Sequence, residues 1–89
     1  MVSPFHVEFT PKSIQDLSRL DKPVAQRILD KIKWLSQNME IASPEPLSYG
    51  LKGKWKLRVG DWRVVYSMDE TVRSMVILYV DHRSKVYKK

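Results

Sequence analysis

The stretch LKGKWKLRVGDWRVVY, residues 51–66, constrains the fold more than any other part of this chain. β-Branched and aromatic residues flank Gly60-Asp61, a pair typical of a tight hairpin turn. The pattern predicts two antiparallel strands, 54–59 and 61–68, in which paired positions sum to 121. One face of this hairpin is then entirely apolar or aromatic. It consists of Trp55, Leu57, Val59, Trp62, Val64 and Tyr66.

The same register gathers cations on the opposite face, where Arg58 faces Arg63, Lys56 faces Val65 and Lys54 faces Ser67. Side chains alternate strictly along a strand, so a slip by one residue would bury these charges. Like charges that face each other destabilise a sheet by roughly 0.2 to 1 kcal/mol per pair. A bound phosphate backbone would offset this cost. The alternative is neutralisation within the fold, and the candidate acids are Glu45, Asp61 and Glu70.

The remaining segments predict a small α+β domain. Residues 6–10 alternate as a strand, and Thr10-Pro11 then starts a helix to about Leu20. A second helix follows Asp21 and runs to about Asn38, while residues 43–50 read as a loop and 74–80 as a strand. We therefore expect one domain, 1–89, in which two helices cover one face of a mainly antiparallel sheet. The apolar stripes of the helices are Ile14, Leu17 and Leu20, then Val24, Ile28, Ile32 and Leu35.

Charge indicates the kind of partner. Residues 1–45 carry six basic and six acidic side chains, whereas residues 46–89 carry ten and four, so the whole net charge of +6 lies in the second half. Such an asymmetry favours a polyanion partner, with a merely solubilising surface as the alternative. The chain has no cysteine, no signal-peptide pattern, and no apolar run longer than 75–80. We expect a cytoplasmic protein without a membrane segment.

The last strand is expected to lead directly into Asp81-His82-Arg83-Ser84-Lys85-Val86-Tyr87, which adds an imidazole, a guanidinium and a phenol near the sheet edge. The two histidines lie far apart, the acids are not at ligand spacing, and no glycine-rich phosphate loop is present. No metal and no cofactor are expected. An enzyme of this sequence that acts on nucleic acid would have to work without a metal ion.

Nearly the whole chain resembles the RelE/ParE superfamily of toxin–antitoxin toxins, and its RelE branch more closely. The matching segments are VEFTPKSIQDLSRLDKPVAQRILDKI, LKGKWKLRVGDWRVVY and DHRSKVY. The resemblance implies an endoribonuclease that cuts mRNA in the ribosomal A site. It also implies a cognate antitoxin, RelB-like and acidic, which neutralises the toxin in a hetero-oligomer.

The resemblance places the catalytic set on Lys54, Lys56, Arg63, Arg83 and Tyr87. The implied reaction is attack of a ribose 2′-OH on the adjacent phosphate, which needs a base, cations and a proton for the leaving oxygen. Arg63 would hold the phosphate and the lysines would stabilise the developing charge, while Arg83 suits either task. Tyr87 is the candidate base, and neighbouring cations would favour its phenolate. Arg58 and Lys85 are further candidates for substrate binding.

Departures from the family pattern leave alternatives open. Asp81 stands where the family often has glycine, and only Lys88 and Lys89 follow Tyr87, so no terminal helix is expected. His82 competes with Tyr87 as acid or base, because the pKa of a free imidazole, about 6.5, suits neutral pH. Two other functions also remain: a ParE-like inhibitor of DNA gyrase, which the Lys, Arg and Tyr set disfavours, and a non-catalytic module that binds RNA or DNA.

Overall fold

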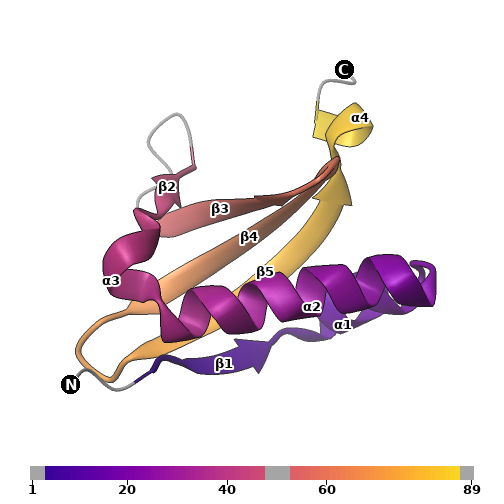
Figure 1. Ribbon diagram of the computed structural model, residues 1–89. Coiled ribbons are helices and arrows are strands. Elements are labelled where there is room, and N and C mark those ends of the chain that lie inside the picture. The colour runs from indigo at the N-terminus through magenta and orange to yellow at the C-terminus, as the bar shows by residue number, and fades with distance from the viewer. Residues whose placement is uncertain (1–3, 48–52, 87–89) are drawn as a thin grey trace.

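The chain folds into a five-stranded sheet with helices packed against it, as a computed structural model that describes residues 4–47 and 53–86 shows (Figure 1). The strand order is β1-β5-β4-β3-β2, with β1 parallel to β5 and the other neighbours antiparallel. The α+β prediction is therefore confirmed. The elements are β1 (His6–Phe9), α1 (Pro11–Ser18), α2 (Lys22–Gln37), α3 (Met39–Ala42), β2 (Glu45–Pro46), β3 (Lys54–Val59), β4 (Trp62–Asp69), β5 (Ser74–His82) and α4 (Arg83–Val86).

The predicted hairpin register is confirmed at all six positions, from Lys54 opposite Ser67 to Val59 opposite Trp62. Gly60 takes a φ of 61° in the turn, a left-handed conformation that glycine adopts without a steric penalty. The apolar face of the hairpin packs toward α2 and the core. The residues of this face differ in solvent exposure. Three are buried (Val59, Val64 and Tyr66) and three are half-buried (Trp55, Leu57 and Trp62).

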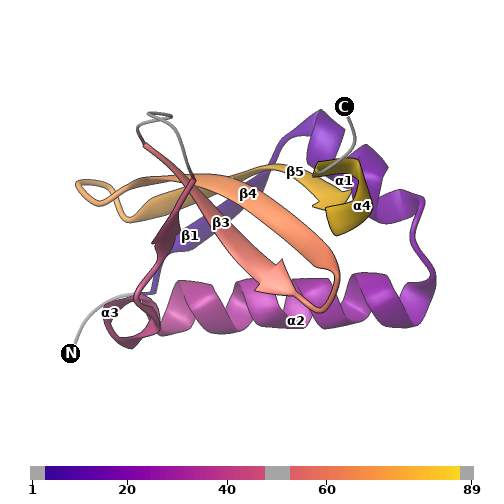
Figure 2. The ribbon, with the colours of Figure 1, turned by 90° about the horizontal axis from the view of Figure 1, so that it is seen from above.

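The long helix α2 crosses beneath the sheet and supplies the other half of the core (Figure 2). Its stripe matches the prediction, because Ile28, Ile32 and Leu35 are buried and Val24 packs against them. The predicted stripe of α1 is wrong at Ile14, which is 56% exposed, while Ser13 is fully buried. The reason is that α1 lies along β5 and turns polar groups toward its backbone.

Strand β1 ends at Phe9, and helix α1 then lies along the same edge of β5. The Thr10 hydroxyl accepts the Ser13 N–H at 3.1 Å as the predicted helix cap, and donates to the Leu78 carbonyl at 2.8 Å. Farther along, the Asp16 carboxylate accepts the Val80 N–H at 3.0 Å. Side chains of α1 thus take the place of a neighbouring strand beside the second half of β5.

Three boundaries differ from the predictions. The presumed loop 43–50 contains β2, which pairs Glu45 with Lys56 and Pro46 with Trp55. Strand β5 does not end at residue 80 but continues to His82, because Asp81 and His82 still pair with β4. The four residues of α4 form a short helix at this end of the sheet, ahead of Tyr87, where no helix was predicted.

Within the described residues, no helix is both long and apolar enough to span a bilayer.

Candidate functional site

Arg63 is the central cation of the sheet face that bears Lys54, Lys56, Arg58 and Arg63, which we call the cationic face. It pairs with Arg58 on one side and with Asp81 on the other. The Asp81 carboxylate accepts a hydrogen bond from Nε of Arg63 at 3.3 Å and another from its second terminal nitrogen at 3.2 Å. Both side chains are about one-fifth exposed. Since a guanidinium has five N–H donors, three of them remain for an incoming anion.

Lys56 lies one row farther along the cationic face, beside Val65 on β4 and Glu45 on β2. Val65 is fully buried although it belongs to this face. Its neighbours in the ladder are Lys56 and Tyr79, both half-buried, and long side chains of this kind can cover a small residue with their apolar parts. The charged groups therefore lie above buried apolar side chains. These lower the local dielectric constant and strengthen the attraction between the cations and a phosphate.

The acid that neutralises Arg63 was not among those that sequence reasoning considered. Asp61 instead lies within 3.8 Å of Arg83, and both of these side chains are exposed. Glu45 and Glu70 form no ion pair in the described part of the chain, and neither do Lys54, Lys56 and Arg58. No local pattern identifies Asp81, because its place opposite Arg63 depends on the β4–β5 register, which shifts between Val65 and Tyr66.

Arg83 begins α4 next to the hairpin turn. Its backbone N–H donates to the Asp61 carbonyl at 2.8 Å, which ties the start of α4 to the β3–β4 turn. The structure thus brings Arg83 to the same end of the sheet as Arg58 and Arg63. Two further predicted site groups, the Lys85 side chain and Tyr87, lie outside the described residues.

His82 is turned away from the cationic face. It pairs with Trp62, and paired residues share a face, so its imidazole lies on the side opposite Arg63 and Asp81. The ring meets the Trp62 indole edge-on with centroids 4.8 Å apart. Its Nδ1 accepts the backbone N–H of Ser84 at 3.2 Å and lies 2.9 Å from the Ser84 hydroxyl. These contacts account for His82 as a residue that packs and caps the start of α4.

Of the tyrosines that the structure describes, Tyr66 is the one buried in the core, at 1% exposure. Its hydroxyl has no hydrogen-bond partner among the described residues. Burial raises the pKa of Tyr66 to about 12, so the phenolate form is strongly disfavoured at neutral pH. Tyr66 is therefore a structural residue and cannot serve the site as a base.

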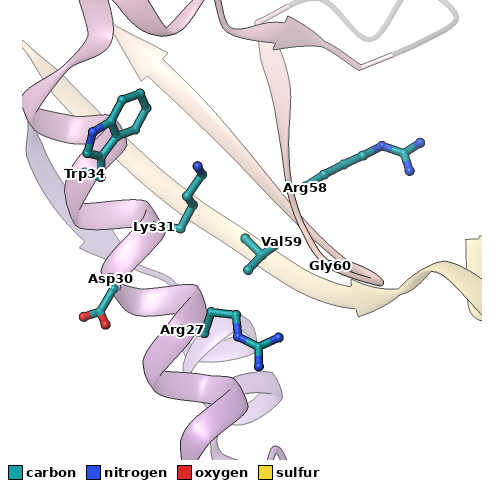
Figure 3. A pocket seen from close by; sticks show the side chains of 7 residues that line it. All are labelled: Arg27, Asp30, Lys31, Trp34, Arg58, Val59 and Gly60. Carbon is teal, nitrogen blue, oxygen red and sulfur yellow. The ribbon is translucent and has the colours of Figure 1, made fainter.

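A separate hollow of about 500 Å³ lies between α2 and the end of β3, outside the site proposed from sequence (Figure 3). Sequence reasoning predicted only the apolar stripe of α2 and gave no signal for the hollow. Of its lining, only Arg58 had been named as a candidate site residue. The lining residues are Arg27, Asp30, Lys31, Trp34, Arg58, Val59 and Gly60.

Comparison with known proteins identifies the family. The toxin RelE of Mycobacterium tuberculosis is 31% identical over 85 residues, which are 96% of this chain and 88% of that protein. The family model for the ParE toxin of the type II toxin–antitoxin system parDE matches residues 7–87. The chain belongs to the RelE/ParE superfamily of type II toxins. The toxin RelG of the same organism is 28% identical over 97% of this chain and 99% of its own length.

Solved structures of RelE-type toxins share the fold. The toxin–antitoxin complex RelBE2 from M. tuberculosis superposes with a TM-score of 0.81 at 29% identity, covering 94% of this chain and 97% of that one. The resemblance read from the sequence is thus confirmed at the level of superfamily and fold, and the protein is a toxin of a toxin–antitoxin system.

Proposed function

We propose that this toxin is a ribosome-dependent mRNA endoribonuclease that inhibits translation through 2′-OH attack on the scissile phosphate. The single domain would span residues 1–89. The observation that carries the proposal is the cationic face itself. Lys54, Lys56 and Arg58, which have no acid partner among the described residues, share one sheet face with the oriented Arg63, and Arg83 adjoins this face at its turn end. The similarity to RelE of M. tuberculosis supports the same reading.

Each cation has a role that follows from its setting. Arg63 is held by Asp81 with three donors left, which suits it to bind the scissile phosphate at a fixed angle. Lys54 and Lys56 have no acid partner in the described residues and would stabilise the charge that develops on the phosphorane. Arg83 would contribute from the adjoining end, and Arg58 and Lys85 would bind flanking phosphates.

Tyr87 is the proposed base and His82 is not. The ring of His82 lies on the face opposite Arg63 and its Nδ1 is occupied by the Ser84 N–H. Tyr87, to which the family resemblance assigns proton transfer, therefore remains the better candidate for the base. The chemistry assigned to this set needs no metal ion.

The proposed partners are the ribosomal A site with its mRNA and a RelB-like, acidic antitoxin. The RelBE2 structure is a toxin–antitoxin complex, which supports an antitoxin for this chain as well. An acidic segment laid over the cationic face would neutralise it and exclude the phosphate backbone. We place the toxin in the cytoplasm, where translating ribosomes are found.

Cleavage on programmed ribosomes tests the proposal. We expect Arg63→Ala and Arg83→Ala each to reduce mRNA cleavage about 100-fold and to relieve growth arrest, because each removes a cation from the transition state. Arg19→Ala, an exposed cation at the end of α1, is the matched control and should retain activity. Full cleavage by both site variants would refute the proposal.

Inhibition of DNA gyrase is the second candidate, favoured by the one observation that the matching family model describes a ParE toxin. Supercoiling by purified gyrase with this toxin separates the two. An unchanged supercoiling rate at a toxin concentration that stops translation would support the ribonuclease proposal. Inhibited supercoiling with unchanged translation would support gyrase inhibition instead.

A further inference from the structure

The hollow between α2 and β3 has a cationic wall that the proposed reaction does not use. Arg27, Lys31 and Trp34 follow one another at spacings of four and three residues, so they lie along one stripe of α2. Val59, which is 7% exposed, and Gly60 line the hollow from the hairpin. Strand β2 pairs only with residues 55 and 56 of β3, and so leaves this end of β3 without a strand neighbour on that side.

Within the described residues, the cations of this wall lack the acid partner that three other arginines have. Arg63, Arg73 and Arg83 each have an acid partner, at 3.2, 3.1 and 3.8 Å. In the described part of the chain no carboxylate lies within ion-pair distance of Arg27 or Lys31. One acid, Asp30, also lines the hollow, against the three cations Arg27, Lys31 and Arg58. In Figure 3 its carboxylate is directed away from Arg27 and Lys31, and it accepts a hydrogen bond from Gln26 at 2.8 Å. The field in the hollow is therefore positive.

Trp34 gives the wall an aromatic surface. Its side chain is 43% exposed, which is unusual for the largest apolar residue in a small domain. The Lys31 ammonium lies 5.0 Å from the centroid of its ring. Exposed aromatic rings among cations are the arrangement with which proteins hold single-stranded nucleic acid, since bases stack on the ring while the cations follow the phosphates.

Arg58 links this hollow to the cationic face. Arg58 is one of the lining residues, and its side chain extends outward from β3 in Figure 3. On the sheet it stands directly opposite Arg63. A strand of RNA held at Arg63 can thus continue over Arg58 and around the edge of β3.

We propose that the hollow is a second RNA subsite, in which Arg27 and Lys31 hold a phosphate and Trp34 stacks on a base, on the same RNA strand that the cationic face engages. The ligand class rests on the proposed function. A volume of about 500 Å³ lies within the usual range for small-ligand pockets and suits one nucleotide. The subsite adds affinity and fixes the path of the strand; it takes no part in bond breaking.

Fluorescence anisotropy with a labelled single-stranded RNA oligomer tests the subsite on the full chain. The variant Arg27→Gln/Lys31→Gln should bind about tenfold more weakly at low salt, and the slope of log affinity against log salt should fall by about 0.7 to 1.4. Trp34→Ala should weaken binding by about five- to tenfold with an unchanged salt slope, because it removes stacking and no charge. All three residues are exposed, and circular dichroism checks that the variants fold.

The control is Lys22→Gln/Lys33→Gln, which removes the same charge from exposed positions of α2 that do not line the hollow. RNA binding by Arg27→Gln/Lys31→Gln that equals this control would overturn the subsite. The subsite would also be overturned if Arg27→Gln/Lys31→Gln lost affinity for poly-L-glutamate and not for RNA. The hollow would then bind an acidic polypeptide instead. If the wild type binds RNA through these residues but cleaves no mRNA on ribosomes, the proposed reaction fails and the subsite stands.

Discussion

Arg63 and Asp81 face each other across β4 and β5 and share two hydrogen bonds, of 3.3 and 3.2 Å. The carboxylate holds one edge of the guanidinium and leaves the other edge free. Asp81 thus has two opposing effects on a phosphate: it fixes the direction of the remaining donors and it reduces the net charge of the site.

The variant Asp81→Asn separates these two effects, because orientation acts on kcat and net charge acts on KM. We expect kcat for mRNA cleavage to fall about tenfold because the guanidinium loses its fixed orientation. KM should stay the same or fall, since the cationic face gains one net positive charge. Steady-state cleavage at increasing concentrations of programmed ribosomes measures both parameters. The control Glu40→Gln breaks an arginine ion pair of similar length, to Arg73, on a different part of the surface and should leave both unchanged. An unchanged kcat for Asp81→Asn would show that Arg63 needs no partner.

Tyr66→Phe should not destabilise the fold. The Tyr66 hydroxyl is buried without a partner among the described residues, and such a group costs about 1 to 3 kcal/mol in lost hydration. Removing it should leave the free energy of unfolding unchanged or raise it by up to about 1 kcal/mol. Urea denaturation measures this, with Tyr79→Phe on the other face of the sheet as the comparison. A loss of more than about 1 kcal/mol would reveal a hydrogen bond to the Tyr66 hydroxyl.

Asp16 should make stability depend on acid pH. Burial raises the pKa of Asp16, but hydrogen bonds from Lys12 and the Val80 N–H and the charges of Lys12 and Arg19 outweigh it, so the pKa lies below its ordinary value. A carboxyl whose pKa is lower when folded stabilises the protein above its unfolded pKa of about 4 and loses that contribution as the pH falls through the folded pKa.

The variant Asp16→Asn tests this linkage. At pH 7 it should lower the free energy of unfolding by about 1 to 3 kcal/mol, because the Val80 N–H and Lys12 lose a charged acceptor. The difference from wild type should shrink below about pH 4. Asp21→Asn is a suitable control, since Asp21 is exposed at the start of α2 without a side-chain cap bond. A difference that is constant from pH 7 to pH 2 would contradict the linkage.

Tyr87→Phe should chiefly affect cleavage, whereas His82→Ala should chiefly affect stability. Removing the proposed base should reduce single-turnover cleavage by about 10² to 10⁴ with little change in stability. Removing the imidazole should chiefly lower stability, because the edge contact with Trp62 and the bond from the Ser84 N–H are lost. Cleavage rates and urea midpoints measured on both variants separate the roles. A folded His82→Ala protein that cleaves nothing would reverse the assignment.

The hairpin was predictable from sequence because a two-residue turn fixes every pair that follows it. Alternation then decides which residues are core and which form the cationic face, as the six observed pairs of β3 and β4 show. Contacts between distant segments were not predictable in this way. The partner of Arg63 is 18 residues away on a strand whose end no local pattern marks, so Asp81 was placed just after the last strand.

The same limitation explains the error at Ile14. Helical periodicity alone placed it inward, but the orientation of α1 is set by hydrogen bonds to β5 that a local pattern does not contain. The hollow beside α2 went unnoticed for a related reason. Its two walls come from segments separated by about thirty residues, and each wall alone reads as an ordinary solvated surface.

The position of β5 has a consequence for synthesis of the toxin. This strand is the last to be translated, yet it lies inside the sheet between β1 and β4, and both Thr10 and Asp16 bond to its backbone. A nascent chain that lacks β5 leaves β1 without a partner and Arg63 without its carboxylate. β1 and β5 must pair before either is stable. The cationic face is therefore completed only after Asp81, 18 residues beyond Arg63, has emerged from the ribosome that makes the chain.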